Sequence, residues 1–150
     1  MPTDVVDYLQ SFLTLAAVGI ILTATFSMYV NSLGQGSEGN KLKEILNQVA
    51  SKAVDALAML TEDNATLSVV FSLPLKIGNQ DYWIRIGNDS SAAWVEGAFG
   101  SVSMDGEQEY RVYLPKKVYA SGTFEGGYQL AQLNCTMNDS TPQITLSRRE

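Results

Sequence analysis

The residues of this chain whose type and spacing could do chemistry are four asparagines. Each opens an Asn-x-Ser/Thr triplet, the acceptor motif for N-linked glycans. Eight Asn and 24 Ser or Thr residues in 150 positions give about 1.3 such triplets by chance, so four is an excess. We expect glycan attachment on four residues: Asn64, Asn88, Asn134 and Asn138. Asn88 and Asn138 both open Asn-Asp-Ser segments, which favour exposed turns.

A second group of residues could bind a cation. Asp105, Glu107 and Glu109 alternate around an Asp105-Gly106 turn, and carboxylate oxygens are ligands for Ca²⁺. Alternating acids beside a turn are more typical of a solvated hairpin, so we expect no metal here. The single cysteine, Cys135, is expected to be a small buried hydrophobic residue.

The composition excludes several classes of function. The chain has 10 Lys and Arg against 16 Asp and Glu, a net charge of −6, which is unsuited to nucleic-acid binding. It has no His, which removes imidazole metal sites and Ser-His or Cys-His catalysis. No phosphate loop, nucleotide fingerprint or nucleophile elbow is present. We therefore expect a protein that is not an enzyme and uses no cofactor.

The elements that carry these residues differ strongly along the chain. Residues 8–37 are an uncharged run of 30, and about 20 apolar residues suffice for a helix to cross a bilayer. This run predicts a hydrophobic helix over residues 1–33, with Tyr8 and Tyr29 near the two interfaces. Small residues within it allow close helix approach, namely Ala16, Ala17, Gly19 and Ala24.

A glycine-rich linker is expected at residues 34–39, followed by an amphipathic helix over residues 40–61. Asn40 is suited to the N-cap of this second helix. Its narrow apolar stripe is rich in alanine and suits close packing. The partner is either the chain's own sheet or a neighbouring subunit, and one stripe could serve both.

The remaining residues, 62–150, are typical of a β domain. Short runs rich in Val, Ile, Phe, Tyr and Trp predict six strands, at residues 67–73, 81–87, 92–99, 110–113, 127–133 and 143–147. Strands this short and this closely spaced favour an antiparallel β-sandwich. The expected fold class is therefore α+β, with a long hydrophobic helix, an amphipathic helix and a β-sandwich.

The orientation across the membrane follows from two opposed signals. Lys41 and Lys43 follow the apolar run and no cation precedes it, which alone would place the β domain in the cytoplasm. The four glycan acceptor motifs instead favour an external β domain. We expect the β domain outside.

The arrangement resembles archaeal type IV pilin-like proteins, a superfamily that includes pilins, archaellins and stator-type proteins of the archaellum. The local part of the resemblance is Thr3-Asp4-Val5-Val6-Asp7-Tyr8-Leu9 and the apolar run after it. If Thr3 is the first residue after leader removal, Asp7 is the fifth. The resemblance implies that this acid pairs with the N-terminal amine of a neighbouring subunit. Those families carry a basic leader ending in a small residue, whereas only Met1-Pro2 precedes Thr3 here.

The function that the resemblance implies is a structural subunit of an extracellular archaeal filament at the cell surface, and the sequence does not distinguish cell adhesion, swimming and DNA uptake. The precursor lies in the membrane, and the subunits form a homopolymer with glycosylated β domains outside. The expected assembly residues are Asp7, Ala16, Ala17, Gly19, Ile21 and Ala24. The first alternative is a single-pass membrane protein whose β domain binds the surface layer or an archaellum motor component. The second is an unrelated anchored domain that binds a ligand.

Overall fold

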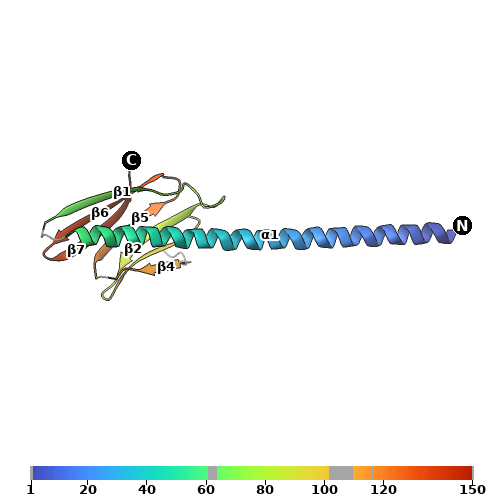
Figure 1. Ribbon diagram of the computed structural model, residues 1–150, viewed down its shortest axis with the longest axis horizontal. Helices are drawn as coiled ribbons and strands as arrows, with labels where there is room; N and C mark the ends of the chain where they lie inside the picture. Colours follow the sequence, from blue (N-terminus) through green and yellow to red (C-terminus); the bar gives the residue numbers. More distant parts are fainter. Residues whose placement is uncertain (1, 61–63, 102–109, 116, 150) are drawn as a thin grey trace. The chain divides into compact units, whose positions relative to one another are not determined.

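The computed structural model describes residues 2–60, 64–101, 110–115 and 117–149 (Figure 1). Within these residues, one helix, α1 (Pro2–Met59), precedes a sheet of seven strands. The α+β class and the long N-terminal helix are therefore confirmed. The chain divides into two compact units, Met1–Ser37 and Glu38–Glu150.

The break expected at residues 34–39 is not present, because α1 continues through them. Gly34 and Gly36 each weaken a helix by about 1 kcal/mol relative to alanine. Neither removes a backbone N–H as proline would, so the hydrogen-bond ladder persists. The residues expected to form a second helix are the last turns of α1. The boundary between the two units nevertheless falls inside the expected linker, between Ser37 and Glu38.

The sheet is mixed, with the strand order β1-β6-β7-β5-β2-β3-β4. All neighbouring strands are antiparallel except β5 and β7, which run parallel. One strand, β5, is absent from the six that the sequence predicts. The strands are β1 (Thr66–Ser72), β2 (Tyr82–Asn88), β3 (Ala93–Phe99), β4 (Tyr110–Tyr113), β5 (Tyr119–Glu125), β6 (Leu130–Asn138) and β7 (Thr141–Arg148).

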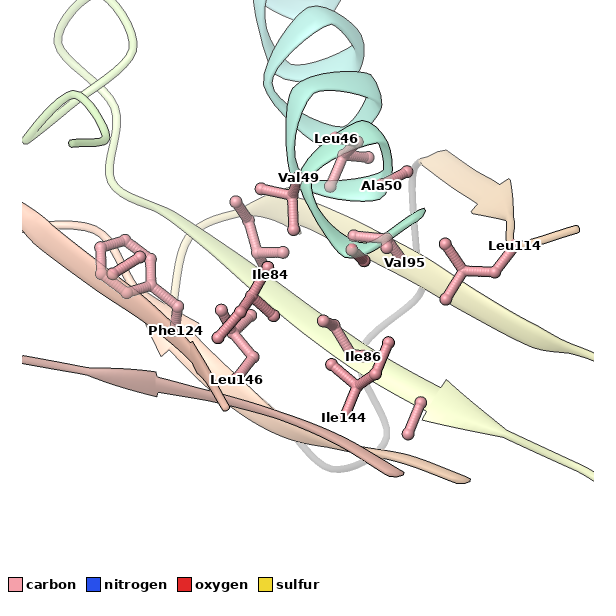
Figure 2. Close-up of a cluster of buried hydrophobic side chains, with 14 of the residues drawn as sticks. Leu46, Val49, Ala50, Ile84, Ile86, Val95, Leu114, Phe124, Ile144 and Leu146 are labelled. Carbon is pink, nitrogen blue, oxygen red and sulfur yellow. The ribbon is translucent and has the colours of Figure 1, made fainter. Parts of the chain in front are cut away.

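The expected sandwich is replaced by one sheet with a helix on its inner face. Most buried apolar side chains of the strands point to one side and form one core with the last turns of α1, so a helix takes the place of a second sheet. Figure 2 shows Leu46, Val49 and Ala50 of α1 above Ile84 and Val95. The α1 residues buried in this core are Leu42, Ile45, Leu46, Val49, Ala50, Ala53, Ala56 and Leu57.

The helix can approach the sheet closely because β3 carries a glycine where they cross. A Cβ atom at Gly97 would lie 2.7 Å from the carbonyl oxygen of Trp83 and 3.1 Å from Cδ2 of Leu46. Any side chain at this position would push the helix and the sheet apart.

The opposite face of the sheet carries a buried carboxylate. Glu96 is 2% exposed and lies between Arg85 and Arg111 in the register of β2, β3 and β4. Arg85 Nε donates to Glu96 Oε1 at 2.7 Å, and Arg111 Nη2 donates to Oε2 at 2.7 Å. The Arg111 guanidinium also stacks over the Trp94 ring, 4.3 Å from its centroid. Both oxygens of the carboxylate are thus paired, which is what permits its burial.

Leu46→Ala tests the helix as the second layer of the core. Removing a fully buried leucine is expected to lower the free energy of unfolding by about 2–5 kcal/mol. Gln48→Ala, on the exposed side of α1, is the matched control and should change it by less than about 0.5 kcal/mol. Chemical unfolding of the full chain in detergent micelles, followed by tryptophan fluorescence, measures both. Equal effects of the two substitutions would contradict this packing.

Tyr82 predicts a loss of stability at high pH. Its side chain is 1% exposed and its hydroxyl donates to the carbonyl oxygen of Pro74 at 2.5 Å. Burial raises the pKa of Tyr82 to about 12, from an ordinary value of 10.0. The neutral phenol therefore stabilises the fold fully below pH 10, and this stabilisation is lost as the pH rises through about 12. Tyr82→Phe should flatten the fall of the unfolding free energy over this range, and an unchanged slope would contradict the assignment.

Candidate assembly helix and glycosylation sites

The first unit of the chain exposes a long apolar surface. Every residue of this unit whose burial is described is exposed, including Phe12 at 63%, Leu15 at 76% and Ile20 at 71%. A window of 18 residues in α1 has a mean hydropathy of 1.9, and none of it is buried. By length and composition, α1 can cross a membrane. An apolar surface of this size is unstable in water and needs an apolar environment.

Three threonines inside this apolar stretch have hydroxyl groups that bond to the helix backbone. The hydroxyls of Thr14, Thr23 and Thr25 each donate to the carbonyl four residues earlier, at 2.8 Å. These bonds leave the hydroxyl protons paired without water. These three hydroxyl groups can therefore enter hydrocarbon or a protein core without losing hydrogen bonds.

The six residues expected to act in assembly do not share one face of α1. At about 100° per residue, Ala17, Ile21 and Ala24 fall within about 60° of one another, and Ala16 and Asp7 lie at the sides of this stripe. Gly19 lies about 160° from Ile21, on the opposite side of the helix. In the structure, a Cβ atom at Gly19 would have no neighbour within 4 Å. Small residues thus occur on two sides of the helix, which suits a helix with neighbours on more than one side.

Two of the four glycan acceptors are exposed and lie near each other. Asn138 ends β6, and the next two residues, Asp139 (φ 46°) and Ser140 (φ 64°), form the two-residue turn into β7. Asn64 has a φ of 64° and its backbone N–H donates to the carbonyl oxygen of Met137 at 3.0 Å. Both asparagines therefore lie at the β6–β7 hairpin end of the sheet, with room for a sugar.

Asn88 differs from the expectation that its triplet is an exposed turn. Its side chain is half-buried, and its Oδ1 accepts a hydrogen bond from the backbone N–H of Ala120 at 3.0 Å. The side chain thereby ties the end of β2 to β5. Asp89 is exposed and accepts bonds from Ser91 Oγ and the N–H groups of Ser91 and Ala92, which lower the pKa of the Asp89 carboxyl. The Asn88 amide is thus part of the structure.

Asn134 lies within β6 and not in the loop after it, because β6 extends to Asn138. Its Oδ1 accepts a hydrogen bond from Gln132 Nε2 at 2.9 Å, and its side chain is half-buried. The neighbouring Cys135 is fully buried, and burial raises the pKa of its thiol. A thiol in this setting is unreactive, as expected from its apolar context.

The described residues contain no group of three or more acidic, His or Cys side chains that could hold a metal ion. The acids considered for Ca²⁺, Asp105, Glu107 and Glu109, lie outside the described residues. The buried Glu96 is occupied by its two arginines. No family model, curated protein or solved structure matches this chain.

The four acceptor motifs are expected to differ in use. Peptide mass spectrometry of native protein should find glycan on Asn64 and Asn138, where the side chains are exposed. Asn88→Ala should lower the free energy of unfolding by about 1 kcal/mol, because the Ala120 N–H loses its acceptor. Asn138→Ala is the matched control and should have little effect. Glycan confined to Asn88 and Asn134 would contradict this assignment.

Proposed function

We propose that this protein is the structural subunit of an extracellular archaeal filament. The filament is built by packing the part of α1 that lies in the first unit of the chain against the same segment of other copies. The observation that carries the proposal is the run of exposed apolar side chains from Val5 to Leu33. These 29 positions extend over about 43 Å of helix, whereas the hydrocarbon core is about 30 Å thick. A bundle of identical helices covers a surface of this length along its whole extent.

The route to the filament passes through the membrane. A chain with this apolar segment is held in the bilayer as a precursor and leaves it when neighbouring copies replace the lipid. The threonine hydroxyls are bonded within the helix, and small residues lie on two of its sides. Both features are compatible with lipid and with close packing against neighbouring helices. The proposed contacts are head-to-tail contacts that do not close into a ring, and such contacts produce an open helical filament.

The second unit then forms the outer layer of the filament. Its helix–sheet core is complete within residues 38–150, so the sheet needs no contribution from the first unit. Glycans at Asn64 and Asn138 would lie on the surface of this layer. Asp7, in the second turn of α1, would pair with the N-terminal amine of a neighbour and set the axial register of the subunits.

The second candidate is a single-pass membrane protein whose β domain binds the surface layer or a component of the archaellum motor. The observation that favours it is that α1 alone meets the length and composition of one membrane crossing. A tilted helix accommodates an apolar stretch longer than the bilayer. In that case the chain stays in the membrane fraction and forms no filaments.

Variants of the helix separate these two functions. Gly19→Leu meets no obstacle within the chain, so its cost of about 1–3 kcal/mol per site arises only where a neighbouring helix approaches. Ile21→Asp would bury an unpaired carboxylate. Both are expected to abolish filaments when expressed in the native host and imaged by electron microscopy. Leu13→Met conserves volume and is the control that should assemble normally.

Asp7→Ala should slow or prevent filament formation while leaving the sheet folded, as read by tryptophan fluorescence. Membrane-fraction blots show whether each variant reaches the bilayer. Normal filaments from both Gly19→Leu and Ile21→Asp would exclude this helix as the packed core of the filament. Recovery of the unaltered chain from the membrane fraction alone, with no filaments, would exclude the filament function and favour the second candidate.

A further inference from the structure

The strand β1 forms an open edge of the sheet. It pairs with β6 on one side, and in the part of the chain that the structure describes no strand lies on its other side. The side chains at alternate positions of this strand, Thr66, Ser68, Val70 and Ser72, are exposed. An edge strand presents a row of backbone N–H and C=O groups that can pair with another chain.

The hydrogen bonds at the two ends of the β1–β6 pairing show which groups face outward. Leu73 N–H donates to Gln129 O at 3.0 Å, and Met137 N–H donates to Ala65 O at 3.0 Å. Both pairs keep the register that joins Val69 to Leu133. Because bonded and non-bonded pairs alternate in antiparallel strands, the odd-numbered residues bond to β6. The backbone groups of the even-numbered residues therefore point away from the sheet.

This edge lacks the devices that usually prevent pairing. Residues 66–72 contain no charged residue and no proline, and they form a seven-residue strand. The opposite edge, β4, has only four residues, and one of them is Arg111, which pairs with Glu96. Short length and charge protect an edge from pairing, so β4 is protected and β1 is not.

We propose that β1 pairs antiparallel with β1 of a second copy of this chain, across a two-fold axis at Val69. In this register, the outward backbone groups of Thr66 face those of Ser72 of the second copy, and Ser68 faces Val70 in the same way. Every outward N–H and C=O of the strand then has a partner, in about eight hydrogen bonds. The two seven-stranded sheets join into one.

The side chains of β1 suit a copy of themselves. On the inner face, Leu67 would meet Phe71 of the second copy, and the two Val69 side chains would meet each other. Leu67 and Val69 are half-buried in the single chain and would be covered by this pairing. On the outer face Val70, 37% exposed, would meet Ser68. No like charges are brought together, which identical strands otherwise risk.

This contact is distinct from the helix packing of the proposed function. A two-fold contact is isologous and joins only two copies. It would link subunits of neighbouring filaments, or two copies anchored in one membrane. It depends on β1 and not on the first unit, so its failure would leave the filament function standing.

Cysteine cross-linking of the full chain in membrane vesicles tests the pairing, after expression in a host without N-glycosylation. In the proposed register the Cα atoms of the two Val69 residues are about 4.5 Å apart, within the range for a disulfide. Val69→Cys should give a disulfide-linked dimer under mild oxidation, at least tenfold above the matched control Leu67→Cys. Leu67 lies about 13 Å from its copy in this register. The unaltered chain, with its buried Cys135, sets the background.

A second substitution asks whether the cross-link depends on backbone pairing. Val70→Pro removes an outward N–H without removing a bond to β6, and edge strands tolerate proline in this orientation. Added to Val69→Cys, it should reduce the dimer about tenfold with unchanged tryptophan emission. Val70→Lys, which places a charge at the edge, should also reduce the dimer about tenfold. It replaces the proline variant in this test if that variant is unfolded. Gly19→Leu added to Val69→Cys should leave the dimer intact.

Absence of the Val69→Cys dimer would overturn the proposal. Equal cross-linking at Leu67→Cys would overturn it too, because it indicates collision without a register. A dimer that persists in folded Val70→Pro and Val70→Lys variants, or that disappears with Gly19→Leu, would also overturn it.

Discussion

A helix whose apolar side chains have no partner in their own chain is the constraint on which the rest of this protein depends. The apolar side chains of α1 are buried differently in the two units of the chain. The turns after Glu38 are covered by the strands, and they supply the sheet with its second layer. The turns before Ser37 find no such cover among the described residues. Their environment must therefore come from outside the chain, as lipid or as other helices.

On the face of the sheet away from α1, the buried carboxylate of Glu96 joins three neighbouring strands without a second layer. Three neighbouring strands each contribute one charged residue at the same register position, with Glu96 between two arginines. Aromatic rings cover the guanidinium groups, so Arg111 lies over Trp94 and Arg85 lies over Trp83. The pairing of strands thus supplies order where apolar packing against a helix is absent.

The sequence predicted the elements that carry a strong pattern and missed those that depend on distant partners. Residues 8–37 are a long uncharged run and the strand beginning at Tyr82 alternates between its two faces; these patterns predict a helix and a strand, and both are present. The strand β5 was missed because Ser121 and Gly122 interrupt its residues that favour strands, and its pairing with β2 and β7 fixes it as a strand. The helix through residues 34–39 was missed because glycine is unfavourable but not prohibitive there.

The glycan acceptors illustrate the same limit at the level of single side chains. The triplets beginning at Asn88 and Asn138 have identical letters, and the sequence gives no reason to separate them. The two asparagines differ because the backbone N–H of Ala120, 32 positions after Asn88, donates a hydrogen bond to the Asn88 side chain. No local pattern could reveal it. The same Asp-Ser pair forms a two-residue turn after Asn138 and only part of a longer connection to β3 after Asn88.

The position of β7 in the sheet has a consequence for biosynthesis. This strand comes last of the seven in the chain, yet it lies between β6 and β5 and joins the two halves of the sheet. Until it leaves the ribosome, the nascent chain can hold only two part-sheets with open edges. The first turns of α1 need no such delay, because the backbone hydrogen bonds of a helix are local. In the proposed membrane-held precursor, the apolar segment therefore reaches the membrane before the sheet can close, and targeting precedes folding.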